Sequence, residues 1–348
     1  MMIKRRHSFR WYEYLAGVGV VLLTALFCVC AGSVPVPVSS TLAAIGSLLR
    51  GAPPPEGVAG AIIVSVRLPR VLCVALSGAA LSLCGAAMQG LMRNPLADGS
   101  TMGVSSGASL GAVLAIAFGI SVPGMPYVGT IAMAMVFAFG SLMLILTLSY
   151  ALDRSLSSHT MILTGVVFTM FVTSLINLIT VFAGEKVKSI TFWTMGSLAG
   201  SSMLHAALLL GALTVGAAIL LSHASELDAF AIGEEEARYI GVPVRRAKLT
   251  VLVAVSALIG VCVSIGGNIG FVGLVMPHML RRATGPSHRR LLPASMLGGA
   301  VFLMLADLVG RTVISPIELP IGVITSLIGA VVFMAIFYRS GKEGAGKC

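Results

Sequence analysis

The C-terminal tail carries a glycine and lysine pattern that could bind a nucleotide phosphate. Residues 341–348 spell GKEGAGKC, close to the G-x-x-x-x-G-K-[ST] loop whose backbone N–H groups hold phosphates. Cys348 stands where the magnesium-ligating hydroxyl belongs, and the helix that should follow such a loop is missing from the sequence. We therefore expect no ATP site and no bond chemistry in this chain, and any ATP must be hydrolysed elsewhere.

Three acidic residues lie beside apolar segments, where an ion-coupled transporter would carry its coupling carboxylates. Asp98 follows an Arg-Asn-Pro turn, and Glu318 lies between two prolines. Asp307 lies four residues before Arg311, so a helix would place the two on one face as a pair. We expect all three acids at the membrane boundary, which leaves an ion-coupled secondary transporter as the less favoured alternative.

Histidines, cysteines and methionines could suggest a metal site. His278 and His288 lie ten residues apart and are flanked by arginines, with no acidic residue nearby in the sequence, so structural roles are favoured over zinc binding. The six cysteines lack zinc-ligand or C-x-x-C spacing, and the 18 methionines suit flexible packing better than haem or copper ligation. We expect no metal site.

The composition identifies the environment in which these residues must be positioned. Of the 348 residues 57% are hydrophobic and only 10% are charged, with a mean hydropathy of +1.00. A soluble domain carries roughly 25% charged residues, so this is an integral membrane protein. The net charge of +10 fits basic loops that set orientation better than nucleic-acid binding, because no basic patch is interleaved with aromatic residues.

Ten apolar segments follow one another along the chain. They are 12–32, 61–91, 102–122, 127–150, 160–183, 203–222, 248–266, 269–280, 291–310 and 316–338. A spanning helix needs about 20 residues, so 61–91 is too long for one upright span and 269–280 is too short. We expect an all-α polytopic membrane protein with about ten transmembrane helices, in a single transmembrane domain covering 1–348.

The distribution of lysine and arginine predicts the orientation. With a cytoplasmic N-terminus and alternating spans, 17 of the 23 basic residues lie inside and six lie outside, among them Arg67, Arg70 and Arg311. Cytoplasmic loops carry the excess of basic residues, so both termini, as tails 1–11 and 339–348, are expected in the cytoplasm. The segment 12–32 is long enough to span and is expected to be an uncleaved first helix.

Two connecting stretches differ from the short loops elsewhere. Residues 33–60 hold several prolines and are expected to form an extended external loop. Residues 223–248 are polar, and their helix formers end at Gly241 and Pro243, which predicts a short amphipathic helix on the cytoplasmic face. Such a helix could receive the push of a separate motor, or the stretch could be an ordinary solvated loop.

Long motifs in a fixed order give the chain a specific resemblance. They are Arg67-Leu-Pro-Arg70, Gly85-Ala-Ala-Met-Gln-Gly90, Arg93-Asn-Pro-Leu-Ala-Asp98, Gly103-Val-Ser-Ser-Gly-Ala108, Trp193-Thr-Met-Gly-Ser197, Gly233-Glu-x-x-Ala-Arg238-x-x-Gly241, Gly270-Phe-Val-Gly-Leu-x-x-Pro277-His278, His288-Arg-x-Leu-Leu-Pro293, Ala306-Asp307 and Glu318-Leu-Pro-Ile-Gly322. Together they resemble the FecCD-type permease subunits of ATP-binding-cassette importers for ferric siderophores, haem and cobalamin, over about residues 12 to 338.

The resemblance implies partners on both sides of the membrane. Permeases of this family work with a second permease copy or a paralogue, with a cytoplasmic ATPase dimer that binds ATP and magnesium, and with an external substrate-binding protein. Arg67, Arg70 and Arg311 match the arginines that pair with acidic residues of the binding protein, a wet interface that charge-assisted pairs suit. Snorkelling at the membrane interface is the alternative for Arg67 and Arg70.

The resemblance also implies two sites on the cytoplasmic side. The ATPase-coupling residues match Gly233, Glu234, Ala237, Arg238 and Gly241. The cytoplasmic gate, at the turn between the fourth and fifth spans, matches Ser157, Ser158 and His159. His159 departs from the family pattern and could tempt a metal-ligand interpretation, but a lone histidine at a helix start is more often a cap or a solvated residue.

The expected function is therefore transport without catalysis. We expect a permease in the bacterial or archaeal cytoplasmic membrane that passes an iron chelate inward by alternating access at a dimer interface. Ferric siderophores are the favoured cargo, and haem and cobalamin are the alternatives. A structural membrane scaffold is a further rival, and it would show no flux.

Overall fold

The described part of the chain folds into helices joined by turns and short loops. The computed structural model describes residues 11–32, 36–51, 58–99, 102–122, 128–154 and 157–345. Within these ranges no strand forms, and Val122 is a lone bridge residue. The all-α expectation is confirmed. Residues 1–10 of the expected N-terminal tail and 346–348 of the expected C-terminal tail lie outside the described residues.

Each of the ten expected apolar segments contains a helix. The helices are α1 (Trp11–Cys30), α4 (Leu68–Leu91), α5 (Val104–Phe118), α6 (Val128–Leu152), α7 (Ser158–Phe182), α9 (Met203–Ser222), α12 (Val244–Gly266), α13 (Val272–Thr284), α14 (His288–Thr312) and α15 (Ile321–Ala345). In the described part of the chain, seven helical stretches are long and apolar enough to cross a membrane. The helices α5 and α13 are shorter, with 15 and 13 residues.

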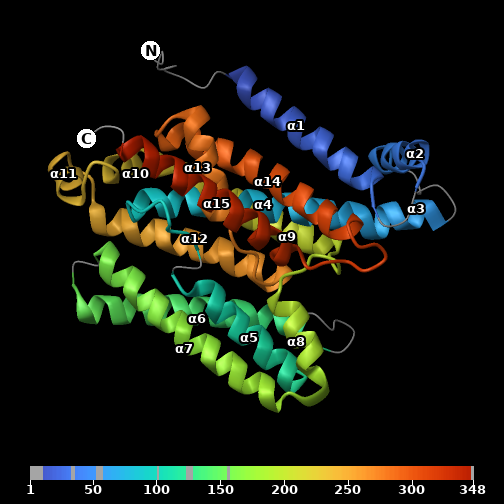
Figure 1. Ribbon diagram of the computed structural model, residues 1–348, viewed down its shortest axis with the longest axis horizontal. Helices are drawn as coiled ribbons and strands as arrows, with labels where there is room; N and C mark the ends of the chain where they lie inside the picture. The colour runs from blue at the N-terminus through green and yellow to red at the C-terminus, as the bar shows by residue number, and fades with distance from the viewer. Residues whose placement is uncertain are drawn as a thin grey trace.

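The long helices lie side by side in one bundle, and shorter helices gather at its two ends (Figure 1). One end, called here the α11 end, carries α10 (Ala224–Phe230) and α11 (Glu234–Tyr239). The opposite end, the α8 end, carries α2 (Val38–Leu49), α3 (Val58–Ile62) and α8 (Val187–Thr194). A π-helical turn, Ile63–Arg67, joins α3 to α4, and a 3-10 turn, Gly184–Lys186, leads into α8.

The expectation of an extended loop at 33–60 is wrong. Twelve of its residues form α2, and α3 begins at Val58. The prolines that suggested an extended chain fall at its edges: Pro37 directly precedes α2, while Pro35 and 53–55 lie outside the described residues. A proline just before a helix is compatible with it, because the first helical N–H groups have no partner within the helix.

Helix α4 is the centre of the bundle. The most apolar window of its span is 78% buried, against 11% for α1 and 17% for α7. Gly78 and Gly85, seven residues apart on one face of α4, pack against backbone carbonyls of Gly299 in α14 and Gly273 in α13. No side chain fits between these backbones, so glycine allows the close helix contact that small residues provide in membranes. Helices α1 and α7 are peripheral, with surfaces left for lipid or a partner.

Helix α13 is a half-helix that begins inside the bundle. The chain leaves α12 at Gly267 (φ +69°) and enters α13 through Phe271, whose φ of +67° is unusual for a residue with a side chain. Thirteen residues span about 20 Å, so α13 starts well below the α8 end and descends to the α11 end. Irregular backbone at this depth is tolerated where it is buried in protein or lines a cavity. The carbonyl of Trp193 packs against Gly267, and Asn268 lines a cavity.

Candidate functional site at the two membrane faces

The polar stretch 223–248 forms two short helices at the α11 end, in agreement with the helix predicted before Gly241. Gly241 has a φ of +90°, which ends α11 and favours glycine. Ala237 is fully buried and holds α11 against the bundle. Ile232, Tyr239 and Ile240 project from this charged segment with 67%, 89% and 69% of their surface exposed. The sequence reasoning missed this apolar tip, although large apolar residues in a polar loop are the signal for it.

The five predicted coupling residues do not share one surface. Arg238 and Gly241 are exposed, whereas Gly233 and Ala237 are buried. Glu234 turns inward, and its Oε1 lies 2.6 Å from the Nζ of Lys248 in α12. The surface that α11 offers to a partner therefore includes Glu235, Glu236, Arg238, Gly241 and the apolar tip.

The predicted gate turn lies against this coupling segment. Ser157 caps α7, because its hydroxyl accepts a hydrogen bond from the N–H of Thr160 at 3.4 Å. The hydroxyl of Ser158 donates to Glu234 Oε1 at 3.4 Å, so a predicted gate residue contacts a predicted coupling residue. His159 is exposed, as expected of a solvated histidine, and the cap is Ser157 instead.

A second polar contact ties α10 to the start of α14. Asp228 Oδ1 lies 2.7 Å from Nδ1 of His288 and accepts the backbone N–H of His288 at 2.7 Å, and Asp228 Oδ2 accepts from the Ser287 hydroxyl at 2.9 Å. Burial raises the pKa of Asp228, but the hydrogen bonds from His288 and Ser287 outweigh it and leave the pKa below its usual value. The expectation that His288 has no acidic partner is wrong. Its partner Asp228 lies 60 positions away in the sequence, too far for spacing to indicate the contact.

At the α8 end the structure brings the three predicted docking arginines together and buries them. Arg67, Arg70 and Arg311 are 5%, 6% and 3% exposed. Asp307 lies between two of them, 2.9 Å from Arg70 Nη2 and 2.9 Å from Arg311 Nε, so the predicted pair of Asp307 and Arg311 is confirmed. Glu318 Oε2 lies 2.7 Å from Arg70 Nη1.

The same arginines also satisfy the end of α1. Arg67 donates to the carbonyls of Val29 and Cys30 at 2.9 Å each, and Arg311 donates to those of Cys28 and Ala31 at 3.2 Å each. The last carbonyls of a helix have no partner within it, so cations there satisfy them and interact favourably with the helix dipole.

These contacts were not expected for arginines that either pair with a binding protein or snorkel at the membrane interface. The guanidinium groups of Arg67, Arg70 and Arg311 are engaged within the subunit, and Glu318, with 37% of its side chain exposed, is the accessible charge of the cluster. Direct docking by the arginines stays a prediction.

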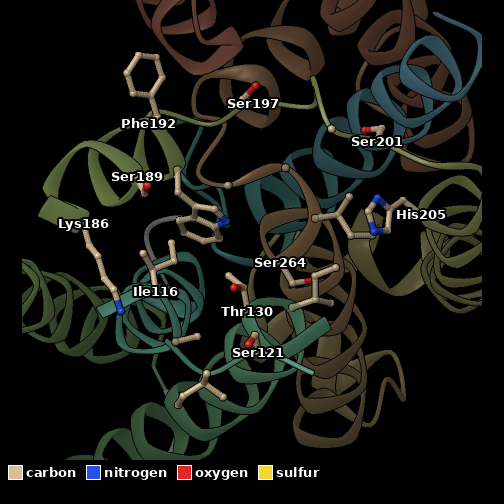
Figure 2. Close-up of a pocket in the computed structure, with 18 of the residues that line it drawn as sticks. Ile116, Ser121, Thr130, Lys186, Ser189, Phe192, Ser197, Ser201, His205 and Ser264 are labelled. Carbon is tan, nitrogen blue, oxygen red and sulfur yellow. The ribbon is translucent and has the colours of Figure 1, made fainter. Parts of the chain in front are cut away.

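A cavity of about 650 Å³ opens near the α8 end (Figure 2). Trp193 and Phe192 supply aromatic surface from α8, and Lys186 stands at one side with its Nζ donating to the carbonyl of Ala117 at 3.1 Å. Apolar residues such as Ile116 line other parts of the wall, and hydroxyl groups, including those of Thr130 and Ser264, are interspersed among them (Figure 2). The cavity can hold a bulky molecule that combines apolar and polar surface.

Asp98 lies deep in the bundle, so its expected position at a cytoplasmic boundary is wrong. Its neighbour Gly99 packs against Ile259, which lies 15 residues into α12, or about 22 Å from the start of that helix. The chain after α4 turns back into the bundle without forming a helix, a path that leaves no trace in hydropathy. Asp98 lines a second cavity of about 650 Å³ with Asn268 and Phe271.

These features define a class of protein: a helical membrane permease with a half-helix inside the bundle, cavities and a projecting segment, α10–α11. Residues 20–339 match the FecCD transport family, and the chain belongs to it. It is a transmembrane transport subunit of the ATP-binding-cassette type.

Individual relatives agree with this membership. The chain is 39% identical over 346 residues to the uncharacterized ABC transporter permease protein YvrB of Bacillus subtilis, covering 98% of this chain and 97% of YvrB. It is 37% identical to the hemin transport system permease protein HmuU of Yersinia pestis, covering 82% and 85%. An inward-facing structure of a putative metal-chelate type ABC transporter superposes with a TM-score of 0.82 at 32% identity, covering 94% and 99%.

Proposed function

We propose that this chain is the permease of an ATP-driven importer and works with a cytoplasmic ATPase dimer, an external binding protein and a second copy or paralogue. The observation that carries the proposal is the tip of the α10–α11 segment. Ile232, Tyr239 and Ile240 expose apolar surface beside charged residues, and such a patch is stabilised when a partner covers it. ATP and magnesium belong to the partner ATPase, and this chain needs no cofactor.

The α11 end faces the cytoplasm of a bacterium or archaeon, and the α8 end faces outward. The excess of lysine and arginine assigned to the α11 side supports this orientation. In this orientation the ATPase binds α11 on the cytoplasmic side of the membrane. The binding protein meets the surface around Glu318, where the buried Arg67, Arg70 and Arg311 hold the ends of α1, α4 and α14 in register.

The proposed cargo is an iron chelate. Ferric siderophores are the favoured class, with haem and cobalamin as alternatives. The similarity to a hemin permease and to a metal-chelate transporter supports a bulky chelate. The cavity lined by Trp193, Phe192 and Lys186 supports it as well, because aromatic faces and a nearby cation suit large conjugated or anionic ligands.

Uptake into proteoliposomes tests the function directly. The complete complex should take up one labelled chelate when ATP is supplied, and substitution of the catalytic residue in the ATPase should abolish uptake. Ferric siderophores, haem and cobalamin are compared side by side, and saturation by a single one identifies the cargo. ATP-independent uptake, or no uptake of any chelate by the intact complex, would overturn the proposal.

One observation favours a second candidate, ion-coupled transport. Asp98 is an acidic residue at mid-depth beside a cavity, and such residues often mark ion or proton pathways. A protonophore added to the same proteoliposomes separates the two functions. ATP-driven import is insensitive to it, whereas ion-coupled transport collapses with the gradient.

A further inference from the structure

We infer that Glu234 is a positioning residue that ties the coupling helix α11 to the gate turn at the start of α7, with Lys248 as its fixed anchor. The inference rests on the proposed function, since it concerns how a push on α11 reaches the gate. Three elements that are distant in the sequence meet at one carboxylate oxygen: α7 through Ser158, α11 through Glu234 and α12 through Lys248.

Lys248 makes this junction rigid. Its side chain is 1% exposed, although its ammonium group carries a full charge, and its Nζ lies 2.6 Å from Glu234 Oε1. A buried charge that loses its counter-charge is strongly destabilising. Turning Glu234 toward an ATPase would break this short contact with a buried cation, so we expect α11 to move together with the base of α12.

The contact with Ser158 is the adjustable half of the junction. At 3.4 Å it is longer than a usual hydrogen bond between a hydroxyl and a carboxylate, while the ion pair on the same oxygen is short. The weaker contact can break and re-form as the gate turn moves, whereas the ion pair persists. Glu234 thus offers Ser158 a hydrogen-bond acceptor that is held in place relative to α11 and moves with that helix.

This role differs from that of a residue touching the ATPase. Glu235, the next residue of α11, is exposed and has the same charge, so it is the matched control for any effect of charge on partner binding. If α11 binds the ATPase through its outer face, Glu235 contributes to that interface and Glu234 does not. The two glutamates should therefore separate association from coupling.

The test uses the complete permease and ATPase complex in proteoliposomes, with Glu234→Gln compared with Glu235→Gln. Three quantities are measured: ATPase retained on purification, the rate of ATP hydrolysis, and cargo taken up per ATP. For Glu234→Gln we expect retention within about twofold of wild type and uptake per ATP reduced about two- to fivefold, the factor expected for an ordinary hydrogen bond and not for a strong charge-assisted one. Glu235→Gln should keep uptake per ATP unchanged.

Two further variants guard against misfolding and isolate the link. Glu234→Leu combined with Lys248→Met replaces the ion pair by apolar groups, which proteins often tolerate, and should insert normally but stay uncoupled. Ser158→Ala should lower uptake per ATP in the wild type and change nothing further in the Glu234→Leu/Lys248→Met variant, because leucine offers Ser158 no acceptor and both changes remove the same link.

The outcomes separate the inference from the proposed function. Loss of ATPase association in Glu234→Gln would make Glu234 a partner contact, and uptake per ATP equal to that of Glu235→Gln would show that no link exists. Either result overturns the inference while ATP-driven uptake by the wild type stands. Failure of the wild-type complex to import with ATP would instead overturn the proposed function.

Discussion

Asp307→Asn should be among the most destabilising near-isosteric substitutions at the α8 end. The carboxylate is 2% exposed and touches two buried guanidinium groups, with its Oδ1 at 2.9 Å from Arg70 and its Oδ2 at 2.9 Å from Arg311. An asparagine has nearly the same shape but no charge, and it turns a donor amide toward one of the arginines. The variant therefore removes the counter-charge and leaves the packing in place.

The magnitude follows from what remains in contact with each arginine. Breaking a buried ion pair costs about 3–5 kcal/mol. Arg311 keeps its two carbonyl acceptors at the end of α1 and Arg70 keeps Glu318, so the lower value, about 3 kcal/mol, is expected. With an unfolding entropy of about 2 cal/mol/K per residue over 348 residues, this corresponds to a Tm lowered by roughly 4 °C.

Thermal unfolding of the detergent-purified protein, followed by size-exclusion recovery after heating, measures the effect. Glu318→Gln is the matched control because it loses a carboxylate from the same network at a half-exposed position, where an ion pair contributes at most about 1 kcal/mol. Equal shifts for the two variants, or a Tm for Asp307→Asn within 1 °C of wild type (about a quarter of the predicted shift), would refute the reasoning from burial.

Three further predictions follow from other parts of the bundle. Gly85→Val should prevent accumulation of folded protein, because the valine side chain would overlap a carbonyl of α13. Gly140→Ala is the control and should fold normally, because the added methyl group meets nothing within 4 Å. Fluorescence-detected size exclusion compares the two variants. Tyr239→Ala should weaken ATPase association about tenfold or more without changing Tm, because this side chain is 89% exposed, and a pull-down titration measures the loss. The folded-state pKa of Asp228 is lowered, so its contact with His288 contributes stability above about pH 4 that is lost as the pH falls further. Hydrogen exchange of α10 should show this loss in the wild type and not in Asp228→Asn, and identical profiles would argue against it.

The membrane fold could be predicted from the sequence because it depends on composition and length. Ten apolar segments gave ten helices, and the short segment 269–280 corresponds to the half-helix α13. The helix before Gly241 was also predictable, because glycine at positive φ is a local signal. Helix α2 was missed because its flanking prolines dominated the pattern. The return path through Asp98 was missed because non-helical backbone inside a bundle has no periodicity.

The charged sites were predictable only where the partners are close in sequence. Asp307 and Arg311 are one helical turn apart, and their pairing followed from spacing. Arg70 joins the same carboxylate from 237 positions away, and Asp228 reaches His288 across 60. Charge counting assigned Arg67, Arg70 and Arg311 to one side of the membrane, and the structure gathers all three at the α8 end. Their burial depends on tertiary packing, which a count of charges does not reveal.

The three consecutive glutamates at 234–236 show most clearly what the sequence alone cannot predict about a side chain. All three lie in the first turn of α11, where each negative charge complements the helix N-terminus equally well. Successive residues of a helix point about 100° apart, so one of them had to face the bundle, but the pattern could not say which. The structure shows that it is Glu234, whose Oε1 lies 2.6 Å from the Nζ of Lys248, a residue of the first turns of α12 with a side chain that is 1% exposed. Arg245 and Arg246 lie in the same turns of α12 and are exposed, so the sequence alone does not single out Lys248 as the cation that pairs with an inward carboxylate.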